Sequence, residues 1–489
     1  MFVPNLELLC DDEQRRYWLP LCDRMKVIGC YAQTELGHGT NIPELETVAR
    51  YVPETDEFEI HSPSVTASKW WPGSLGRTAN HAVLLAQLEI AGKRYGLHNF
   101  IVPLRSMETH RPLPGVTVGD IGPKIGFNSM DNGFLSLDRV RVPRRNMAAR
   151  FARVERGGRY TAGGAVLDRM IPRLSMVAVR AFIIGMAGHH LARACTVAVR
   201  YSAVRRQASG GGAESQVLDY TSQMHRLLPL VASAYAFHFT GVDMEARRIA
   251  MEALVLGAGA GIGRGDGGSG SGGGGQGSGV AVKAAEAVLQ QYHADSSGLK
   301  SFCSGVAADG IEDCRRSCGG HGFLLCSGLP ELLGTYLQNV TVEGENSVII
   351  QQTARFLVKV VAAARAGAAR PAAWAQSAYL FDFVSARKNP SRGPIAVQRW
   401  AANCAADARR EELLEAALTH RAARLTVALE ERLRTDAAAA AAAAGSGSAT
   451  AAAAAATAWN DALVEVARVG RAHSMLLAYK AFAAAADAA

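Results

Sequence analysis

The chain has 489 residues, of which 49% are hydrophobic and 20% are charged, and this composition is typical of a folded globular protein with several hydrophobic cores. Its formal net charge of +8 fits either an anionic small ligand or a solvated basic surface. The 52 Lys and Arg residues form no dense basic block with interleaved aromatic residues, so we expect no nucleic-acid partner.

The N-terminal segment, residues 1–25, predicts helix. Asp11 and Asp12 lie where a capped helix start is expected, and Pro20 predicts a break in the helix.

The next region, residues 26–148, has the signals of strands and turns. The runs 82–88 and 96–102 flank a turn at 91–93 and predict a β-hairpin. Residues 134–142 alternate between apolar and polar side chains, which predicts a strand with one buried face. We therefore expect a small β-barrel or sandwich as a middle domain.

After the β region the pattern turns helical. Apolar residues recur at helical spacing over residues 169–207, over residues 216–256 and from Asn346 onward. Long helices with short connections predict an antiparallel bundle. We expect a first helical bundle over residues 149–365 and a second helical domain over residues 366–489, which makes the chain an α+β multidomain protein.

Two low-complexity segments interrupt the helical region. Residues 257–279 are dominated by Gly and Ser and predict a flexible insertion in the first bundle. The spacing Gly263-x-Gly265-x-x-Gly268 inside it is a chance match to a dinucleotide fingerprint, because no strand precedes it. Residues 437–457 are an Ala-rich insertion, for which helix propensity alone favours partial helix.

The sequence predicts no membrane span. The longest uncharged stretch, residues 437–460, is mostly alanine, which is too weakly apolar to hold a helix in lipid. No secretory signal follows Met1, and residues 486–489 lack a peroxisomal address of the Ser-Lys-Leu type. Nine cysteines without regular pairing favour a reducing compartment.

A cluster of potential zinc ligands lies near the middle of the chain. Cys314, Cys318 and Cys326 are close in sequence to His321, but their spacing fits no usual zinc pattern, because no C-x-x-C occurs. We interpret the thiols as helix-packed side chains and predict no metal site.

Two segments of the β region could bind a flat ligand. YAQTELGHGT, at residues 31–40, can present backbone N–H groups and the Thr34 hydroxyl to the heteroatoms of a ring. KWWPG, at residues 69–73, places paired indoles beside a restricted turn and could wall an aromatic ligand. A turn with a hydrophobic plug remains the alternative for each segment.

Two further segments lie in the helical region. GGHG, at residues 319–322, is a backbone suited to close approach of a bulky group. VEGENS, at residues 342–347, comes immediately before the helix expected from Asn346. Acidic residues at a helix start usually just stabilise the helix by interacting with its dipole. Glu343 follows β-branched residues and precedes Gly344, so it can project from a loop into a cavity instead of capping the helix.

Taken together, the chemistry-bearing segments resemble acyl-CoA oxidases in composition, order and spacing. The match runs over residues 1–362 apart from the Gly-rich insertion, and weakens over residues 400–480. The segments that carry it are YAQTELGHGT, SPSVT at residues 62–66, KWWPG, GDIGPK at residues 119–124, YSAVRRQ at residues 201–207, CGGHGF and EGENSVIIQQTARFL.

The resemblance implies a peroxisomal enzyme of fatty acid β-oxidation. Such an enzyme converts a fatty acyl-CoA to a trans-2-enoyl-CoA and reduces molecular oxygen to hydrogen peroxide, with FAD as its cofactor. In the family, the residues that match Thr34 and Gly73 contact FAD, and the residue that matches Glu343 is the catalytic base.

The resemblance also implies a homodimer. By analogy with the wider acyl-CoA dehydrogenase superfamily, Arg205 would contact the FAD pyrophosphate of a partner subunit. Gly319, Gly320 and Gly322 would lie near the adenosine half of the cofactor.

The chain also departs from the family pattern. The family has a whole helical domain before the segment that starts here, and it continues beyond the last residue of this chain. We therefore interpret residues 1–25 as the remnant of an N-terminal helical domain and expect an N- and C-terminally truncated member, with an incomplete second helical domain.

Two other functions remain open. An acyl-CoA dehydrogenase performs the same chemistry on the substrate but uses an electron-transfer flavoprotein as acceptor. Its loop usually resembles T-E-P-x-A-G, whereas LGHG at residues 36–39 is oxidase-like. The other alternative is a catalytically impaired fragment of an oxidase that holds FAD poorly.

Overall fold

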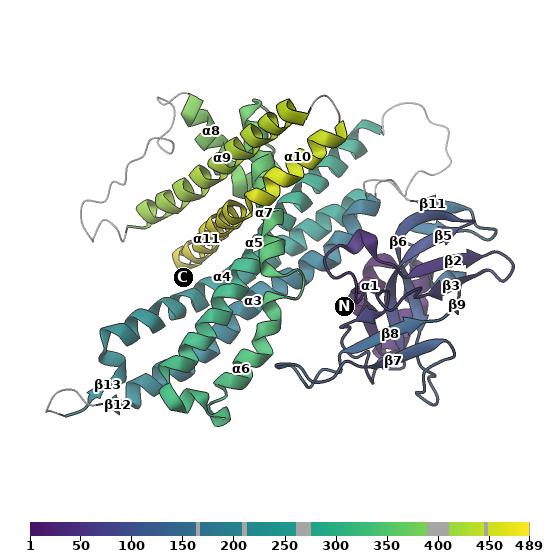
Figure 1. Cartoon of the computed structure of the whole chain (residues 1–489), viewed down its shortest axis with the longest axis horizontal. Helices are drawn as coiled ribbons and strands as arrows, with labels where there is room; N and C mark the ends of the chain where they lie inside the picture. Colours follow the sequence, from purple (N-terminus) through teal and green to yellow (C-terminus); the bar gives the residue numbers. More distant parts are fainter. Residues whose placement is uncertain (163–166, 208–212, 261–274, 389–409, 445–447, 489) are drawn as a thin grey trace. The chain divides into compact units, whose positions relative to one another are not determined.

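The computed structural model describes residues 1–162, 167–207, 213–260, 275–388, 410–444 and 448–488 (Figure 1). It divides into two compact units, Met1–Ser175 and Met176–Ala489. The first unit is mainly β-structure and the second is helical, so the expected α+β architecture is confirmed.

Two short helices open the first unit, α1 (Phe2–Leu9) and α2 (Asp12–Asp23). Asp11 caps α2, because its carboxylate accepts from the Gln14 backbone N–H at 2.9 Å while the Gln14 side chain accepts from the Asp11 N–H at 3.1 Å. The break predicted at Pro20 is wrong, since α2 continues past it. Proline removes one backbone donor, and the last turn still closes through the bond from Arg24 N to Pro20 O at 3.3 Å.

The larger sheet of the first unit has six strands. They run in the order β1 (Gly29–Ala32), β5 (His81–Ile90), β2 (Val48–Val52), β3 (Glu57–His61) and β9 (Val140–Pro143), and β6 (Lys93–Pro103) also pairs with β5. The predicted hairpin is confirmed as β5 and β6, which are antiparallel. Ala91 and Gly92, at φ +49° and +77°, form the two-residue turn that the strand twist favours.

The smaller sheet has three strands in the order β4 (Lys69–Trp70), β8 (Gly133–Leu137) and β7 (Val116–Asp120). The strand predicted over residues 134–142 is therefore two strands in two sheets, β8 and β9. Arg139, at φ +52°, makes the corner between them, and an apolar–polar alternation does not reveal such a corner.

Both sheets contribute to one hydrophobic core, which includes Phe58, Leu84 and Phe100 from the larger sheet and Leu135 from the smaller. Strands also continue beyond residue 148, because β10 (Ala152–Val154) and β11 (Tyr160–Ala162) form a further hairpin.

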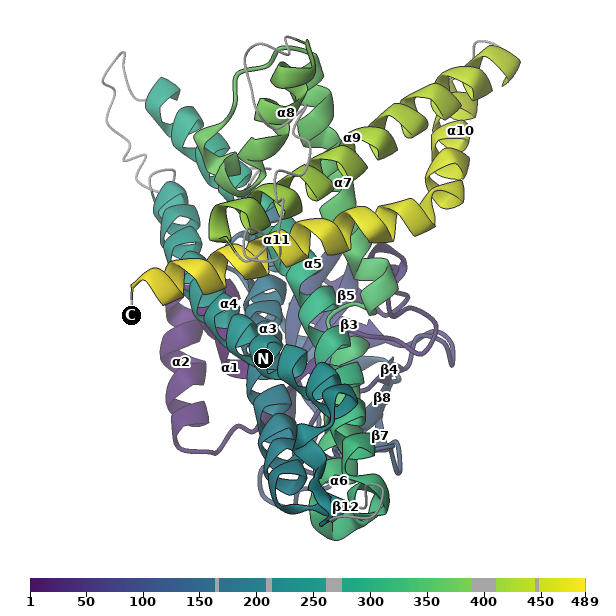
Figure 2. The ribbon, with the colours of Figure 1, turned by 90° about the vertical axis from the view of Figure 1, so that its left-hand side faces the viewer.

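Four long helices make the bundle of the second unit: α3 (Leu167–Val204), α4 (Thr221–Ala260), α5 (Gly275–Ser317) and α7 (Asn346–Arg365). Figures 1 and 2 show α3, α4 and α5 running side by side. The three helical stretches predicted from apolar spacing are thereby confirmed as α3, α4 and α7. A shorter helix, α6 (Leu329–Tyr336), lies between α5 and α7 in sequence.

Helix α5 packs very closely against its neighbours. A Cβ added to Gly298 would lie 2.5 Å from Ser474 Oγ and 2.7 Å from Thr353 Oγ1, so only glycine fits there. Glycine and buried serines on α5 therefore bring three helices into contact where apolar periodicity gives no signal.

The C-terminal helices are α8 (Ala378–Lys388), α9 (Glu411–Ala444), α10 (Ser448–Asp461) and α11 (Leu463–Asp487). Helix α11 packs across α4, α5 and α7 (Figure 2). Phe356 and Leu357 of α7 share one core with Phe383, Val427 and Leu476 of the later helices. The division predicted at residue 366 stays a prediction, because helices on both sides of it share this core.

The predicted insertions are partly helical. Helix α4 ends at Ala260 and α5 begins at Gly275, so both ends of the segment 257–279 are helical, while residues 261–274, including the chance glycine fingerprint, lie outside the described residues. A helix propagates into weak sequence because each added residue adds one hydrogen bond. The Ala-rich segment is helical in α9 and α10, apart from residues 445–447, which are not described.

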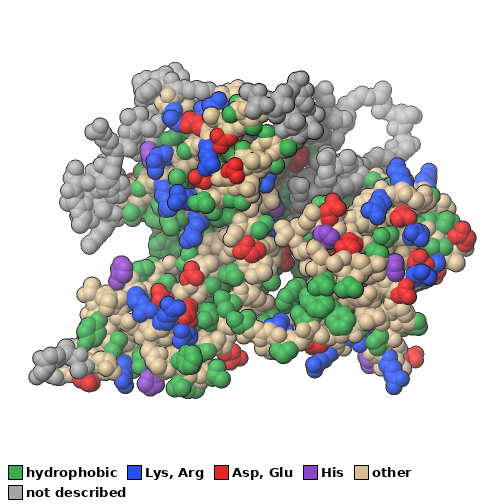
Figure 3. Space-filling view, viewed as in Figure 1, with side chains coloured by type: hydrophobic (Ala, Val, Ile, Leu, Met, Phe, Trp, Pro, Cys, Tyr) green, Lys and Arg blue, Asp and Glu red, His purple; other side chains and the backbone are tan. Residues whose placement is uncertain are grey.

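Two helical segments, Val177–Val204 and Asn346–Arg365, are long and apolar enough to cross a membrane by length and composition alone. Both pack in the bundle with about half of their most apolar window buried, as core helices of a bundle do. On the face drawn in Figure 3, Lys and Arg side chains lie interspersed with Asp and Glu. That face therefore fits a mixed, solvated surface better than a single basic patch.

Candidate functional site

The structure brings together the two segments of the first unit that we predicted to contact a flat ligand. The Thr34 carbonyl accepts from the Trp70 backbone N–H at 2.9 Å, and Glu35 and Lys69 pair as an isolated antiparallel bridge. Thr34 is half-buried and lies two residues after the end of β1, so its position depends on this contact with β4.

A buried ion pair fixes that contact. Lys69 Nζ lies 2.9 Å from Glu35 Oε1, and both side chains are fully buried. The ammonium also donates to the carbonyls of Gln33 and Leu85, at 3.1 and 2.7 Å. Glu35 accepts from the Thr47 hydroxyl and from the N–H groups of Glu46 and Thr47. Burial lowers the pKa of Lys69 to about 8, while Glu35 opposes that shift.

The turn after β4 is strained. Trp71 has φ +84°, which costs a bulky residue about 1–3 kcal/mol. Bonds from Trp71 N to Gly133 O and from Asn132 Nδ2 to Trp71 O hold it there. Trp71 is 53% exposed, and a Cβ on the neighbouring Gly73 would lie 3.0 Å from Met130 Sδ. Of the two predicted indoles, the exposed one is therefore available to a ligand.

The other indole of this segment is part of the protein's own packing. Trp70 is half-buried and stacks on Phe134, with ring centroids 5.6 Å apart. The hydrophobic plug that we kept as an alternative therefore describes Trp70.

In the second unit, Glu343 lies on a loop before α7 and does not cap that helix. Glu345 is the cap, since its carboxylate accepts from the N–H groups of Ser347 and Val348 at 2.9 and 3.2 Å. Glu343 has φ +58° and is followed by Gly344 at φ +102°, so the backbone turns sharply at the glutamate. A residue in this conformation is uncommon outside glycine, and such residues cluster at functional sites.

Two buried cations lie beside this loop. Arg180 of α3 is 2% exposed, and its Nε donates to Glu343 O at 3.3 Å. Lys300 of α5 is fully buried, and its Nζ donates to Gly344 O at 2.7 Å. Burial raises the pKa of Glu343 above the usual range, and Arg180 and Lys300 partly offset that rise. A carboxylate with a raised pKa is a stronger base than one in water.

The glycine segment and Arg205 lie near each other. The Tyr201 hydroxyl of α3 is 3.2 Å from His321 Nδ1, which places the end of α3, where Arg205 follows, beside residues 319–322. Gly319, at φ +59°, and Gly320 are both exposed with open space where a Cβ would point.

Gly322 differs from the other two glycines of the segment. It is buried, and a Cβ there would lie 2.0 Å from Arg315 O. Its own backbone packing therefore requires glycine, whereas Gly319 and Gly320 leave room for a ligand.

The side chains that could ligate a metal differ in exposure and in their protein partners. Cys314 and Cys318 are buried and Cys326 is exposed. Among the residues that the structure describes, Glu35, His38 and Glu46 form the group whose ligand atoms lie close enough to share an ion. In that group Glu35 is paired with Lys69, and Glu46 accepts from the hydroxyls of Ser64 and Thr66, so both carboxylates have protein partners.

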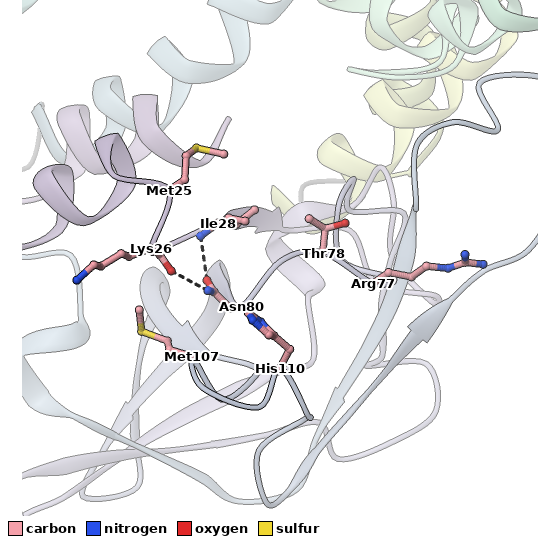
Figure 4. A pocket seen from close by; sticks show the side chains of 8 residues that line it. All are labelled: Met25, Lys26, Ile28, Arg77, Thr78, Asn80, Met107 and His110. Atoms are coloured by element: carbon pink, nitrogen blue, oxygen red, sulfur yellow. Dashed lines mark hydrogen bonds between the residues drawn. The ribbon is translucent and has the colours of Figure 1, made fainter.

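A surface hollow of about 580 Å³ lies in the first unit (Figure 4). Neither Thr34 nor Gly73 is among the residues that line it. Asn80, one of its lining residues, accepts from Ile28 N at 2.9 Å and donates to Lys26 O at 2.8 Å. Both polar atoms of this amide are therefore bonded within the protein and stabilise the fold. The hollow is lined by none of the predicted site residues.

Sequence reasoning did not identify the buried charges. Arg180 gave a usable signal, because it interrupts an otherwise apolar helical run at residues 176–187. Lys69 and Lys300 gave none, since their partners depend on contacts between distant segments.

Comparison with known proteins identifies the class. A family model for the acyl-CoA oxidase C-alpha1 domain matches residues 174–260 and 275–358, and a model for the acyl-coenzyme A oxidase N-terminal region matches residues 1–28. The chain belongs to the acyl-CoA oxidase family.

Individual relatives agree with this assignment. Peroxisomal acyl-coenzyme A oxidase 1 of Arabidopsis thaliana is 47% identical over 374 residues, which are 74% of this chain and 51% of the relative. The crystal structure of an acyl-CoA oxidase from tomato is 38% identical, with a TM-score of 0.82 over all of this chain and 67% of that one. Acyl-CoA oxidase-1 of Caenorhabditis elegans, complexed with FAD and ATP, is 35% identical, with a TM-score of 0.81 over 100% of this chain and 65% of that one.

The chain spans about half to two thirds of the length of the curated relatives that it matches.

Proposed function

We propose that this protein is a peroxisomal acyl-CoA oxidase of fatty acid β-oxidation. It would convert fatty acyl-CoA to trans-2-enoyl-CoA and reduce molecular oxygen to hydrogen peroxide. The observation that carries the proposal is Glu343, a glutamate with a raised pKa that leaves the capping of α7 to Glu345. The names of the relatives support the compartment and the reaction.

The residues present fit FAD. The half-buried Thr34 hydroxyl and Gly73 lie on segments held together by backbone bonds, and Trp71 offers an exposed aromatic face beside them. Gly319 and Gly320 leave open the volume that side chains would fill, as close approach of a cofactor requires. A C. elegans relative has FAD in its solved structure, which supports the same cofactor here.

Glu343 would act as the general base that removes the α-proton of the acyl thioester. Its burial strengthens it as a base, while Arg180 and Lys300 keep it ionisable. When FAD is bound, it supplies the acceptor for the hydride from Cβ and passes the electrons to oxygen. The protein's contribution is therefore to hold one carboxylate in a fixed place with a suitable proton affinity.

We also propose a homodimer. Leu228, Tyr235, Val242 and Ile249 of α4 are all at least 55% exposed and are spaced by seven residues, so they form one apolar stripe. A second copy of the chain would cover such a stripe. In that dimer Arg205, which is exposed, would contact the FAD pyrophosphate of the partner subunit.

The proposal is tested by adding a fatty acyl-CoA to the FAD-loaded protein in air. We expect hydrogen peroxide and trans-2-enoyl-CoA in equal amounts, measured by a peroxidase-coupled assay and by chromatography. Flavin that bleaches without peroxide, and that is reoxidised by an electron-transfer flavoprotein, would assign the chain to the dehydrogenases. A colourless protein that retains no FAD would identify a non-catalytic relative.

Replacement of Glu345 separates the two glutamates of the loop. The Glu345 carboxylate caps α7, and its one other recorded bond is to the Ser347 hydroxyl at 3.4 Å. Glu345→Gln keeps an acceptor oxygen but loses the charge at the helix start, so it is expected to cost up to about 1 kcal/mol of stability. Its rate of peroxide formation should stay close to that of the unmodified protein. Thermal denaturation and the peroxide assay measure the two quantities, and a rate loss as deep as that of a Glu343 variant would contradict the assignment of roles.

A further inference from the structure

The backbone at Glu343 needs support from outside the loop. Glu343 and Gly344 are both at positive φ, and the first of these costs a non-glycine residue free energy. Such a conformation persists only where surrounding contacts determine it. The carbonyls of these two residues receive bonds from charged side chains of two different helices.

Lys300 is the contact from α5. Its Nζ donates to Gly344 O at 2.7 Å and to Asn346 Oδ1 at 3.0 Å. Asn346 is held in turn, because its Nδ2 donates to Ser301 O and to Ser304 Oγ. The loop and the first residue of α7 are therefore attached to one stretch of α5.

The bonding of Lys300 differs from that of the other buried lysine. Lys69 has a carboxylate partner at 2.9 Å, whereas the recorded bonds of Lys300 go to a carbonyl and an amide oxygen. Burying a cation without a bonded carboxylate is costly, which indicates that the charge has a use beyond packing.

Arg180 is the contact from α3. Its Nε donates to Glu343 O at 3.3 Å, and its Nη1 lies 3.1 Å from His293 Nδ1 and 3.3 Å from Ser297 Oγ. His293, Ser297 and Lys300 lie on successive turns of α5. The guanidinium is thus held against α5 while it holds the carbonyl of Glu343.

We propose that Arg180 and Lys300 are positioning residues for Glu343, which hold the left-handed loop from inside the bundle and favour the ionised form of its carboxylate. This inference rests on the proposed function, in which that carboxylate is the base. When Glu343 is ionised, its negative charge offsets one of the two buried positive charges. When Glu343 is protonated, neither positive charge is offset by it. The two cations therefore lower the pKa of Glu343, whereas burial raises it.

Within the described part of the second unit, four charged or titratable groups lie beside the loop. Arg180 comes from α3, His293 and Lys300 come from α5, and Glu345 lies at the start of α7. Burial and the neighbouring Arg180 lower the pKa of Lys300 to about 8, so Lys300 is protonated at neutral pH. Removing its charge should raise the pKa of Glu343 further, because one of the two offsetting cations is lost.

The test compares Lys300→Gln, which keeps a donor for Gly344 O but loses the charge, with Lys300→Arg, which keeps the charge. Lys359→Met is the matched control, since Lys359 is exposed on α7 and donates to Gln290. The carboxyl band of Glu343 is titrated by infrared difference spectroscopy against Glu343→Gln, which requires no turnover. This readout tests the positioning role even if no peroxide is formed.

We expect Lys300→Gln to shift the Glu343 titration to higher pH, and Lys300→Arg and Lys359→Met to leave it in place. The acid limb of the pH profile of kcat/KM should move in the same direction, so that activity lost at low pH returns at higher pH. An unchanged titration midpoint in folded Lys300→Gln would overturn the proposal. If that variant does not fold, Arg180→Gln removes the other charge and carries the same two expectations.

Discussion

Glu343→Gln is expected to leave a folded, yellow protein that forms peroxide about 10²- to 10⁴-fold more slowly, which is the usual contribution of a general base. Glutamine has nearly the shape of glutamate but cannot accept the α-proton. The backbone contacts of residue 343 involve its carbonyl, which the substitution keeps. The rate, the flavin absorbance and the thermal midpoint are measured on one preparation.

The unmodified protein and Glu343→Gln should differ in their dependence on pH, because the pKa of Glu343 is raised. Activity of the unmodified protein should rise with pH through that pKa, above the usual range of a glutamate, because only the ionised form is a base. The folded state favours the protonated form, so ionisation of Glu343 lowers stability as pH rises from the unfolded pKa through the folded one. Above that window the glutamine variant should be at least as stable as the unmodified protein.

Two results would contradict the role of Glu343. One is a rate in Glu343→Gln comparable with that of Glu345→Gln, which has lost only the charge of a helix cap. The other is a loss of flavin together with activity, which would make residue 343 part of cofactor binding instead of proton transfer.

Much of the fold could be predicted because its signals are local. The hairpin of β5 and β6 follows from two apolar runs and the Ala91–Gly92 turn, and α7 follows from its apolar spacing. The corner at Arg139 and the helix α5 were missed for a common reason. A positive φ at a non-glycine residue, and a helix face made of serine and glycine, leave no hydrophobic pattern.

The candidate site was predictable only in part. Glu343 could be distinguished from Glu345 in the sequence, because a glycine follows Glu343 and the helix starts three residues after it. The residues that position it could not be predicted. Arg180, for example, precedes Glu343 by 163 residues, and their contact exists only in the folded bundle. Lys69 lay within a predicted segment, yet its partner Glu35 is 34 residues away and reaches it through strand pairing.

Lys69→Met is expected to cost about 3–5 kcal/mol of stability in the first unit, because removal of one partner leaves the other charge buried without compensation. Glu35 is fully buried beside Lys69, and the carbonyls of Gln33 and Leu85 would also lose a donor. Since these bonds hold the loop that carries Thr34 against β4, FAD retention should fall as well. Chemical denaturation and flavin absorbance measure the two losses.

The matched surface control is Lys93→Met, on an exposed residue of β6, which should stay within about 0.5 kcal/mol of the unmodified protein. The double variant Glu35→Gln/Lys69→Met removes both charges while the glutamine oxygen can still accept from Thr47. It should therefore be more stable than Lys69→Met alone, because the cost of the single change lies in the unpaired charge. If Lys69→Met proves no worse than Lys93→Met, the ion pair does not hold the loop, and the strand pairing between Thr34 and Trp70 must position it alone.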